Sequence, residues 1–75
     1  MMIMSAKEMF EKLGYEYERS DKYIRCIWRP KNNHYCRIIT FDLKNKKFKP
    51  YNQVQFTMDL FKAISKQIEE LRWNK

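Results

Sequence analysis

The fold is decided by residues 23–51, which read YIRCIWRPKNNHYCRIITFDLKNKKFKPY. β-Branched and aromatic side chains recur through this stretch between basic ones, a pattern typical of strands in a sheet with one buried face. Two turn signals interrupt it, Pro30 with the asparagines that follow, and Lys44 with Asn45. Pro50 cannot donate to a ladder and therefore marks an edge strand. The stretch predicts three antiparallel strands, over 23–29, 34–43 and 46–51.

A helix and a further strand precede this stretch. Ser5 and Glu8 have the spacing of a capping box, which predicts a helix over 5–13. Gly14 suits the left-handed conformation that commonly ends a helix. Residues 15–19 then alternate aromatic and charged side chains with a period of two, which predicts the first strand.

A second helix follows the strands. Thr57 is a good N-cap and predicts a helix over 58–72. Asp59 in its first turn and Arg72 in its last turn carry charges of the sign that the helix dipole favours. The apolar stripe of this helix is formed by Leu60, Phe61, Ile64, Ile68 and Leu71. The order α-β-β-β-β-α with short connections predicts one small α+β domain over 1–75. We expect an antiparallel meander sheet with both helices packed on one face.

The turns also predict the register of the strands. If Arg29 pairs with His34, Ile24 faces Ile39, and the second hairpin pairs Phe41 with Phe48. Arg37 then lies at the edge of the core face. A slip of one residue would exchange the two faces of the sheet. The predicted core of the sheet comprises Ile24, Cys26, Trp28, Ile39, Phe41 and Phe48, and its stability should depend most on Phe41, Phe48, Trp28 and Ile64.

Positive charge is concentrated in the middle of the chain. The whole sequence carries 16 Lys and Arg against nine Asp and Glu, a net charge of +7. Ten of the basic residues and only two of the acidic ones lie between Arg19 and Tyr51. The face of the sheet opposite the core is therefore the predicted working surface. Its candidate binding residues are Tyr23, Arg25, Ile27, Arg29, His34, Ile38, Lys47, Lys49 and Tyr51.

A basic sheet face with interleaved aromatic residues is the composition that nucleic acid prefers. Lys and Arg neutralise phosphates, and aromatic rings stack on bases. The predicted function is a non-enzymatic binding module for nucleic acid. The alternative is a protein interaction module that uses the apolar centre of the same face to bind a host factor, an acidic protein or a second copy in a homodimer. Double-stranded RNA-binding domains have a similar segment order, but their lysine cluster is replaced here by Thr57-Met58-Asp59-Leu60.

Other classes of function lack the residues that they need. His34, Cys26 and Cys36 offer at most three ligands for zinc, which takes four. The two cysteines are expected to lie on opposite faces as unpaired thiols. Without paired carboxylates or a glycine-rich loop, we expect neither an enzyme nor a cofactor. No apolar run approaches the roughly 20 residues of a membrane span, and the apolar segment at residues 1–4 is too short for a signal peptide. We therefore expect a cytoplasmic location without membrane contact.

Three segments carry a resemblance to known proteins, namely SAKEMFEKLGYE at 5–16, ITFDL at 39–43, and LFKAI with QIEELRW within 60–73. Together they resemble small phage and prophage proteins of Gram-positive bacteria. The group often has glycine where this chain has Arg72. It has no assigned activity, so the resemblance implies a bacterial cytoplasm and an accessory role in regulation, host takeover or counter-defence. It transfers no functional residue.

Overall fold

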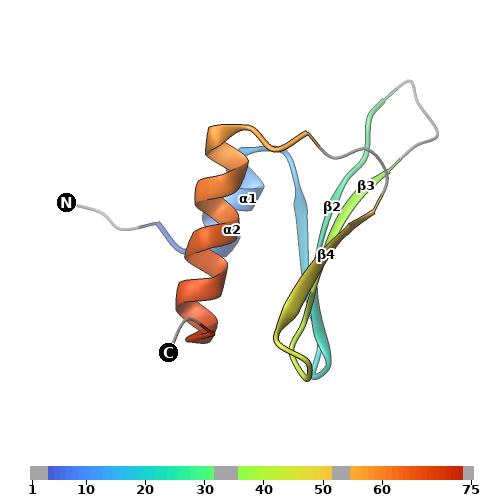
Figure 1. Ribbon diagram of the computed structural model, residues 1–75. Coiled ribbons are helices and arrows are strands. Elements are labelled where there is room, and N and C mark those ends of the chain that lie inside the picture. Colours follow the sequence, from blue (N-terminus) through green and yellow to red (C-terminus); the bar gives the residue numbers. More distant parts are fainter. Residues whose placement is uncertain (1–3, 32–35, 52–54, 74–75) are drawn as a thin grey trace.

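The helices and strands follow the predicted order in the computed structural model, which describes residues 4–31, 36–51 and 55–73 (Figure 1). The strands form one antiparallel sheet in the order β1-β2-β3-β4. Both helices pack against the same face of this sheet, which confirms the α+β meander. The elements are α1 (Ala6–Lys12), β1 (Glu16–Arg19), β2 (Tyr23–Trp28), β3 (Arg37–Asp42), β4 (Lys47–Tyr51) and α2 (Met58–Leu71).

The predicted caps of α1 are confirmed. The Glu8 amide donates to Ser5 Oγ over 3.2 Å, and the Ser5 amide donates to Glu8 Oε1 over 3.1 Å. These hydrogen bonds to Ser5 hold the pKa of the Glu8 carboxyl below its ordinary value. Gly14 has a φ of +94°, and the Tyr15 amide donates to the Phe10 carbonyl over 3.0 Å, which closes the helix in a Schellman motif.

The hairpin between β3 and β4 has the predicted register but a different turn. Phe41 pairs with Phe48, as expected. The turn spans 43–46, and its left-handed residue is Lys46, with a φ of +55°, so the prediction of a tight turn at Lys44 and Asn45 was wrong. The Asp42 carboxylate accepts hydrogen bonds from the amides of Lys44 and Asn45 and thereby fixes the wider turn.

The register of β2 against β3 differs from the prediction by two residues. Ile24 pairs with Phe41 rather than with Ile39, and Cys26 pairs with Ile39. The prediction rested on a tight turn after Arg29, whereas the paired segments end at Trp28 and Arg37 and leave a longer connection. The predicted partner His34 lies outside the described residues. Because the shift is an even number of residues, every side chain stays on its predicted face.

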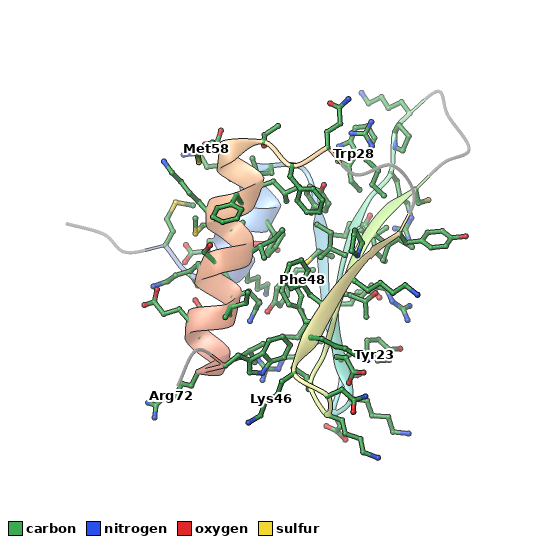
Figure 2. The ribbon with its side chains drawn as sticks, viewed as in Figure 1. Tyr23, Trp28, Lys46, Phe48, Met58 and Arg72 are labelled. Atoms are coloured by element: carbon green, nitrogen blue, oxygen red, sulfur yellow. The ribbon has the colours of Figure 1, made fainter. Side chains whose placement is uncertain are left out.

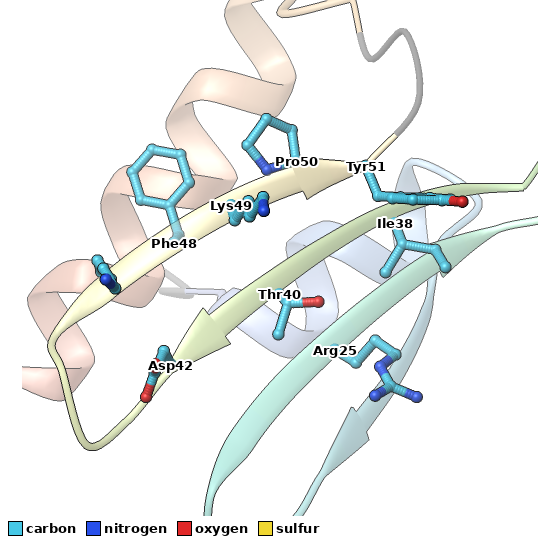
Figure 3. A pocket seen from close by; sticks show the side chains of 9 residues that line it. Arg25, Ile38, Thr40, Asp42, Phe48, Lys49, Pro50 and Tyr51 are labelled. Atoms are coloured by element: carbon cyan, nitrogen blue, oxygen red, sulfur yellow. The ribbon is translucent and has the colours of Figure 1, made fainter.

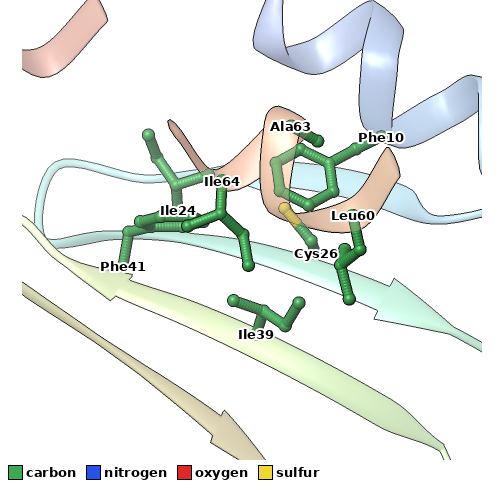
Figure 4. Packing of buried hydrophobic residues seen from close by; sticks show 8 residues of the cluster. All are labelled: Phe10, Ile24, Cys26, Ile39, Phe41, Leu60, Ala63 and Ile64. Carbon is green, nitrogen blue, oxygen red and sulfur yellow. The ribbon is translucent and has the colours of Figure 1, made fainter. Parts of the chain in front are cut away.

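The hydrophobic core lies between the helices and the two central strands (Figure 4). Phe41 is fully buried, and the centroid of its ring lies 6.2 Å from that of Phe10 on α1. The Trp73 ring, just after α2, contacts Phe41 at the same centroid distance. The buried cluster comprises Phe10, Ile24, Cys26, Ile39, Phe41, Leu60, Ala63 and Ile64.

Two predicted core residues are not fully buried. Phe48 is 38% exposed although it points toward the helices (Figure 2), because β4 is an edge strand that the helices do not cover. Trp28 is only partly buried and lies at the end of β2, at its last paired position with β3. The Arg37 guanidinium stacks over the Trp28 ring at 4.6 Å from its centroid, and Arg37 is partly exposed, which confirms its predicted place at the core edge.

The second helix begins as predicted, and four of the five residues of its predicted apolar stripe face the core, namely Leu60, Ile64, Ile68 and Leu71. Thr57 Oγ1 accepts from the Leu60 amide over 3.2 Å, so the N-cap is confirmed. Phe61, predicted in the apolar stripe, is 58% exposed, whereas Gln67 is fully buried. The Tyr17 hydroxyl donates to Gln67 Oε1 over 2.6 Å, which partly compensates for the burial of this amide. Arg72 follows the helix as a C-cap with a φ of +59°, a conformation that glycine adopts at lower cost.

Glu70 connects the two helices. Its carboxylate accepts from the Ala6 amide over 2.8 Å, at the start of α1. On α2 itself, Lys66 Nζ pairs with Glu69 Oε1 at 3.6 Å. A carboxylate at the N-terminus of α1 has the favourable sign for the helix dipole.

Neither cysteine forms a disulfide, and their environments differ. Burial raises the pKa of the Cys26 thiol to about 12, so this thiol stays protonated and unreactive at pH 8. We expect iodoacetamide at about pH 8 to alkylate Cys26 only when the protein unfolds, whereas the partly exposed Cys36 reacts in the native state. Peptide mass spectrometry with and without denaturant measures this difference. Rapid native alkylation of Cys26 would contradict the assignment of the core face.

Candidate functional site

The face of the sheet turned away from α1 and α2, here called the open face, carries three rows of side chains across the strands. The register aligns Glu18, Arg25, Thr40 and Lys49 in the central row. Above and below it lie the rows Glu16, Ile27, Ile38 and Tyr51, and Tyr23, Asp42 and Lys47. Tyr23 accordingly lies on the opposite side of the sheet from Phe48 (Figure 2).

Most of the predicted site residues are brought together on this face. Seven of the nine lie in its rows, namely Tyr23, Arg25, Ile27, Ile38, Lys47, Lys49 and Tyr51. Arg29 directly follows β2 and forms an ion pair with Glu16 of β1. His34 lies outside the described residues.

Ile27 and Arg29 are less available for binding than the sequence suggested. Ile27 is only 5% exposed although it faces away from the helices, so its side chain offers almost no surface for contact with a ligand. Arg29 is exposed, but its charge is matched by Glu16, and this neighbour raises the pKa of the guanidinium further above its ordinary value. The ion pair reduces the positive potential at this corner of the face.

The acidic residues of the open face were missed in the sequence. Glu16 and Glu18 pair with Ile27 and Arg25 of β2 and therefore share the open face with them. Because Glu16 and Glu18 alternate with Tyr15 and Tyr17, the sequence indicates that the two carboxylates share one face of their strand. Which face of the sheet this is becomes known only once β1 is paired with β2. The face is thus divided, with two carboxylates along the β1 edge and two lysines along the β4 edge.

A shallow concavity of about 600 Å³ lies on the β4 side of this face (Figure 3). Arg25, Lys47 and Lys49 line it together with Tyr51, and these four residues are here called the basic half-face. Tyr51 is 61% exposed, and Figure 3 shows its ring beside Ile38. The Arg25 guanidinium lies 4.6 Å from the centroid of the Tyr23 ring, a contact that orients this cation.

Among the described residues that line the concavity, Asp42 is the one carboxylate. The Asn45 side chain donates to Asp42 Oδ2 over 2.8 Å, and two backbone amides of the turn donate to Oδ1. These hydrogen bonds, with the nearby Lys47 as a smaller contribution, lower the pKa of Asp42 below its ordinary value. Asp42 is therefore ionised at neutral pH, but its charge is largely engaged in holding the hairpin turn.

Within residues 4–31, 36–51 and 55–73, no three His, Cys, Asp or Glu side chains come together as a group that could hold a metal ion. Over the same residues, no helix has the length and apolar character needed to cross a membrane. A comparison with known proteins finds no matching family model and no significantly similar curated protein or solved structure.

Proposed function

We propose that the protein is a nucleic-acid-binding module that contacts its ligand through the basic half-face. The observation that carries this proposal is the convergence of three cations and an exposed tyrosine on one concavity. Lys47 and Lys49 project from an edge strand whose side chains are all exposed, so phosphates can approach them freely. Binding of phosphates by such cations releases condensed counterions, which is the main source of affinity for nucleic acid.

The aromatic residues add a contact that phosphate binding alone does not provide. Tyr51 is exposed, and the base of a nucleotide bound to Lys49 can reach its ring along the same strand. Stacking on an aromatic side chain contributes about 1–3 kcal/mol per base. Arg25, held by its contact with Tyr23, lies between the β4 cations and the acidic edge. In this proposal, Tyr51 and Arg25 orient the ligand that the lysines attract.

The alternative function, protein binding through the apolar centre of the face, has less support. That function requires Ile27 and Ile38 to be accessible together, but Ile27 is 5% exposed. Among the open-face residues that line the concavity, the exposed ones are Lys47, Lys49 and Tyr51, whereas Ile38 is half-buried, and this set favours a phosphate ligand. The resemblance to phage and prophage proteins implies, within this proposal, an accessory protein that acts on phage or host nucleic acid.

The dependence of affinity on salt tests the proposed function. Three cations that contact phosphates should give a slope of log K against log [salt] of roughly −2 for a single strand and roughly −3 for a duplex. Fluorescence anisotropy with a labelled oligonucleotide, titrated between about 50 and 200 mM salt, measures this slope. An absence of binding at the lowest salt, or a slope close to zero, would contradict the proposal.

A further inference from the structure

The division of charge across the open face bears on which form of nucleic acid fits it. Lys47 and Lys49 lie on β4, at one edge of the sheet, and Glu16 and Glu18 lie on β1, at the other. Neighbouring strands are about 4.8 Å apart, so three spacings separate these columns by roughly 14 Å. The cations of the face therefore lie on β4 and, through Arg25, on β2, whereas the β1 edge carries carboxylates.

A duplex presents two rows of phosphates to a protein surface. The grooves that separate these rows are about 6 Å and 12 Å wide. If one strand lies on the lysines of β4, the second row of phosphates falls within the width of the sheet, toward the carboxylates of β1. Glu16 is partly neutralised by Arg29, but Glu18 has no comparable ion pair among the described residues. Glu18 would repel the second strand at short range.

A single strand avoids this repulsion and makes better use of the face. Its one row of phosphates can follow Lys47 and Lys49, while its unpaired bases are free to stack on Tyr51. In a duplex the base faces are covered by neighbouring base pairs, so the exposed tyrosine gains no stacking partner. Counterion release alone would favour the duplex, because its charge density is higher. A preference for single strands therefore has to come from the acidic edge and the tyrosine.

We infer that the protein selects single-stranded over double-stranded nucleic acid, and that the carboxylates on β1 exclude the duplex. The inference rests on the proposed function, because it assigns the ligand class of the same basic half-face. Glu18 acts here as a specificity-determining residue that disfavours the second strand.

The experiment compares Glu18→Lys with Glu11→Lys, a matched charge reversal at an exposed position on α1. Dissociation constants for a labelled 16-nucleotide single strand and the corresponding duplex are measured by anisotropy at a fixed salt concentration. We expect the wild-type protein to bind the single strand at least about tenfold more tightly than the duplex. We expect Glu18→Lys to strengthen duplex binding about tenfold and single-strand binding by a smaller factor. Glu11→Lys should leave the ratio unchanged.

The outcomes separate this inference from the proposed function. If the wild-type protein binds the duplex as tightly as the single strand, the inference is overturned while the proposed function stands. It is also overturned if Glu18→Lys and Glu11→Lys change the ratio equally, because the effect is then one of net charge. If neither form binds at low salt, both the proposed function and the inference fail. Far-UV circular dichroism of each variant shows that the sheet is retained.

Discussion

Phe41→Ala is expected to lower the free energy of unfolding by about 3–5 kcal/mol. The side chain is fully buried, and the rings of Phe10, Phe48 and Trp73 surround it at centroid distances of 5.7–6.2 Å. Truncation removes these aromatic contacts and leaves a cavity that the two helices and the sheet cannot close without losing their packing. A single hydrophobic core in a domain of this size supplies only about 3–5 kcal/mol of stability, so the variant should be largely unfolded at physiological temperature.

A matched substitution separates this effect from the loss of a phenylalanine as such. Phe61 lies on α2 and is 58% exposed, so Phe61→Ala should cost less than about 1 kcal/mol. Urea denaturation followed by circular dichroism gives both free energies. Equal losses for the two variants, or a loss below about 1 kcal/mol for Phe41→Ala, would mean that the core face has been assigned incorrectly.

The secondary structure could be predicted from the sequence because its signals are local. The capping box at Ser5, the N-cap Thr57 and the alternation along 23–29 each depend on residues within one or two turns of the chain. Both faces of the central strands were predicted correctly even though the register was not. The error of two residues preserved the alternation that separates Ile24 from Arg25.

The rest depends on distances in space that a local pattern does not contain. Phe48 has the same alternation as Phe41, but its exposure is decided by how far the two helices extend across the sheet. Gln67 can be buried because the hydroxyl of Tyr17, fifty residues earlier in the chain, donates a hydrogen bond to its side chain. The acidic edge of the open face likewise appears only once β1 is paired with β2. A charge count over the middle of the chain therefore overstated how uniformly basic the face is.

The comparison of two double charge reversals tests the central claim, that the basic half-face binds nucleic acid. Lys47→Glu with Lys49→Glu reverses the two cations on β4, and Lys7→Glu with Lys62→Glu reverses two exposed cations on the helices. Both pairs change the net charge by the same amount, so they affect long-range attraction equally. Only the first pair replaces phosphate contacts with repulsion, and circular dichroism is used to check that both variants fold.

The measurement is the dissociation constant of each variant for a single-stranded oligonucleotide at about 50 mM salt, where electrostatic contacts contribute most. We expect the β4 pair to weaken binding by about 100-fold, since two contacts of roughly 1.4 kcal/mol each are lost. The helix pair should weaken binding by only a few-fold, through the change in net charge. Equal losses for the two pairs, or a larger loss for the helix pair, would contradict the assignment of the binding surface to the sheet.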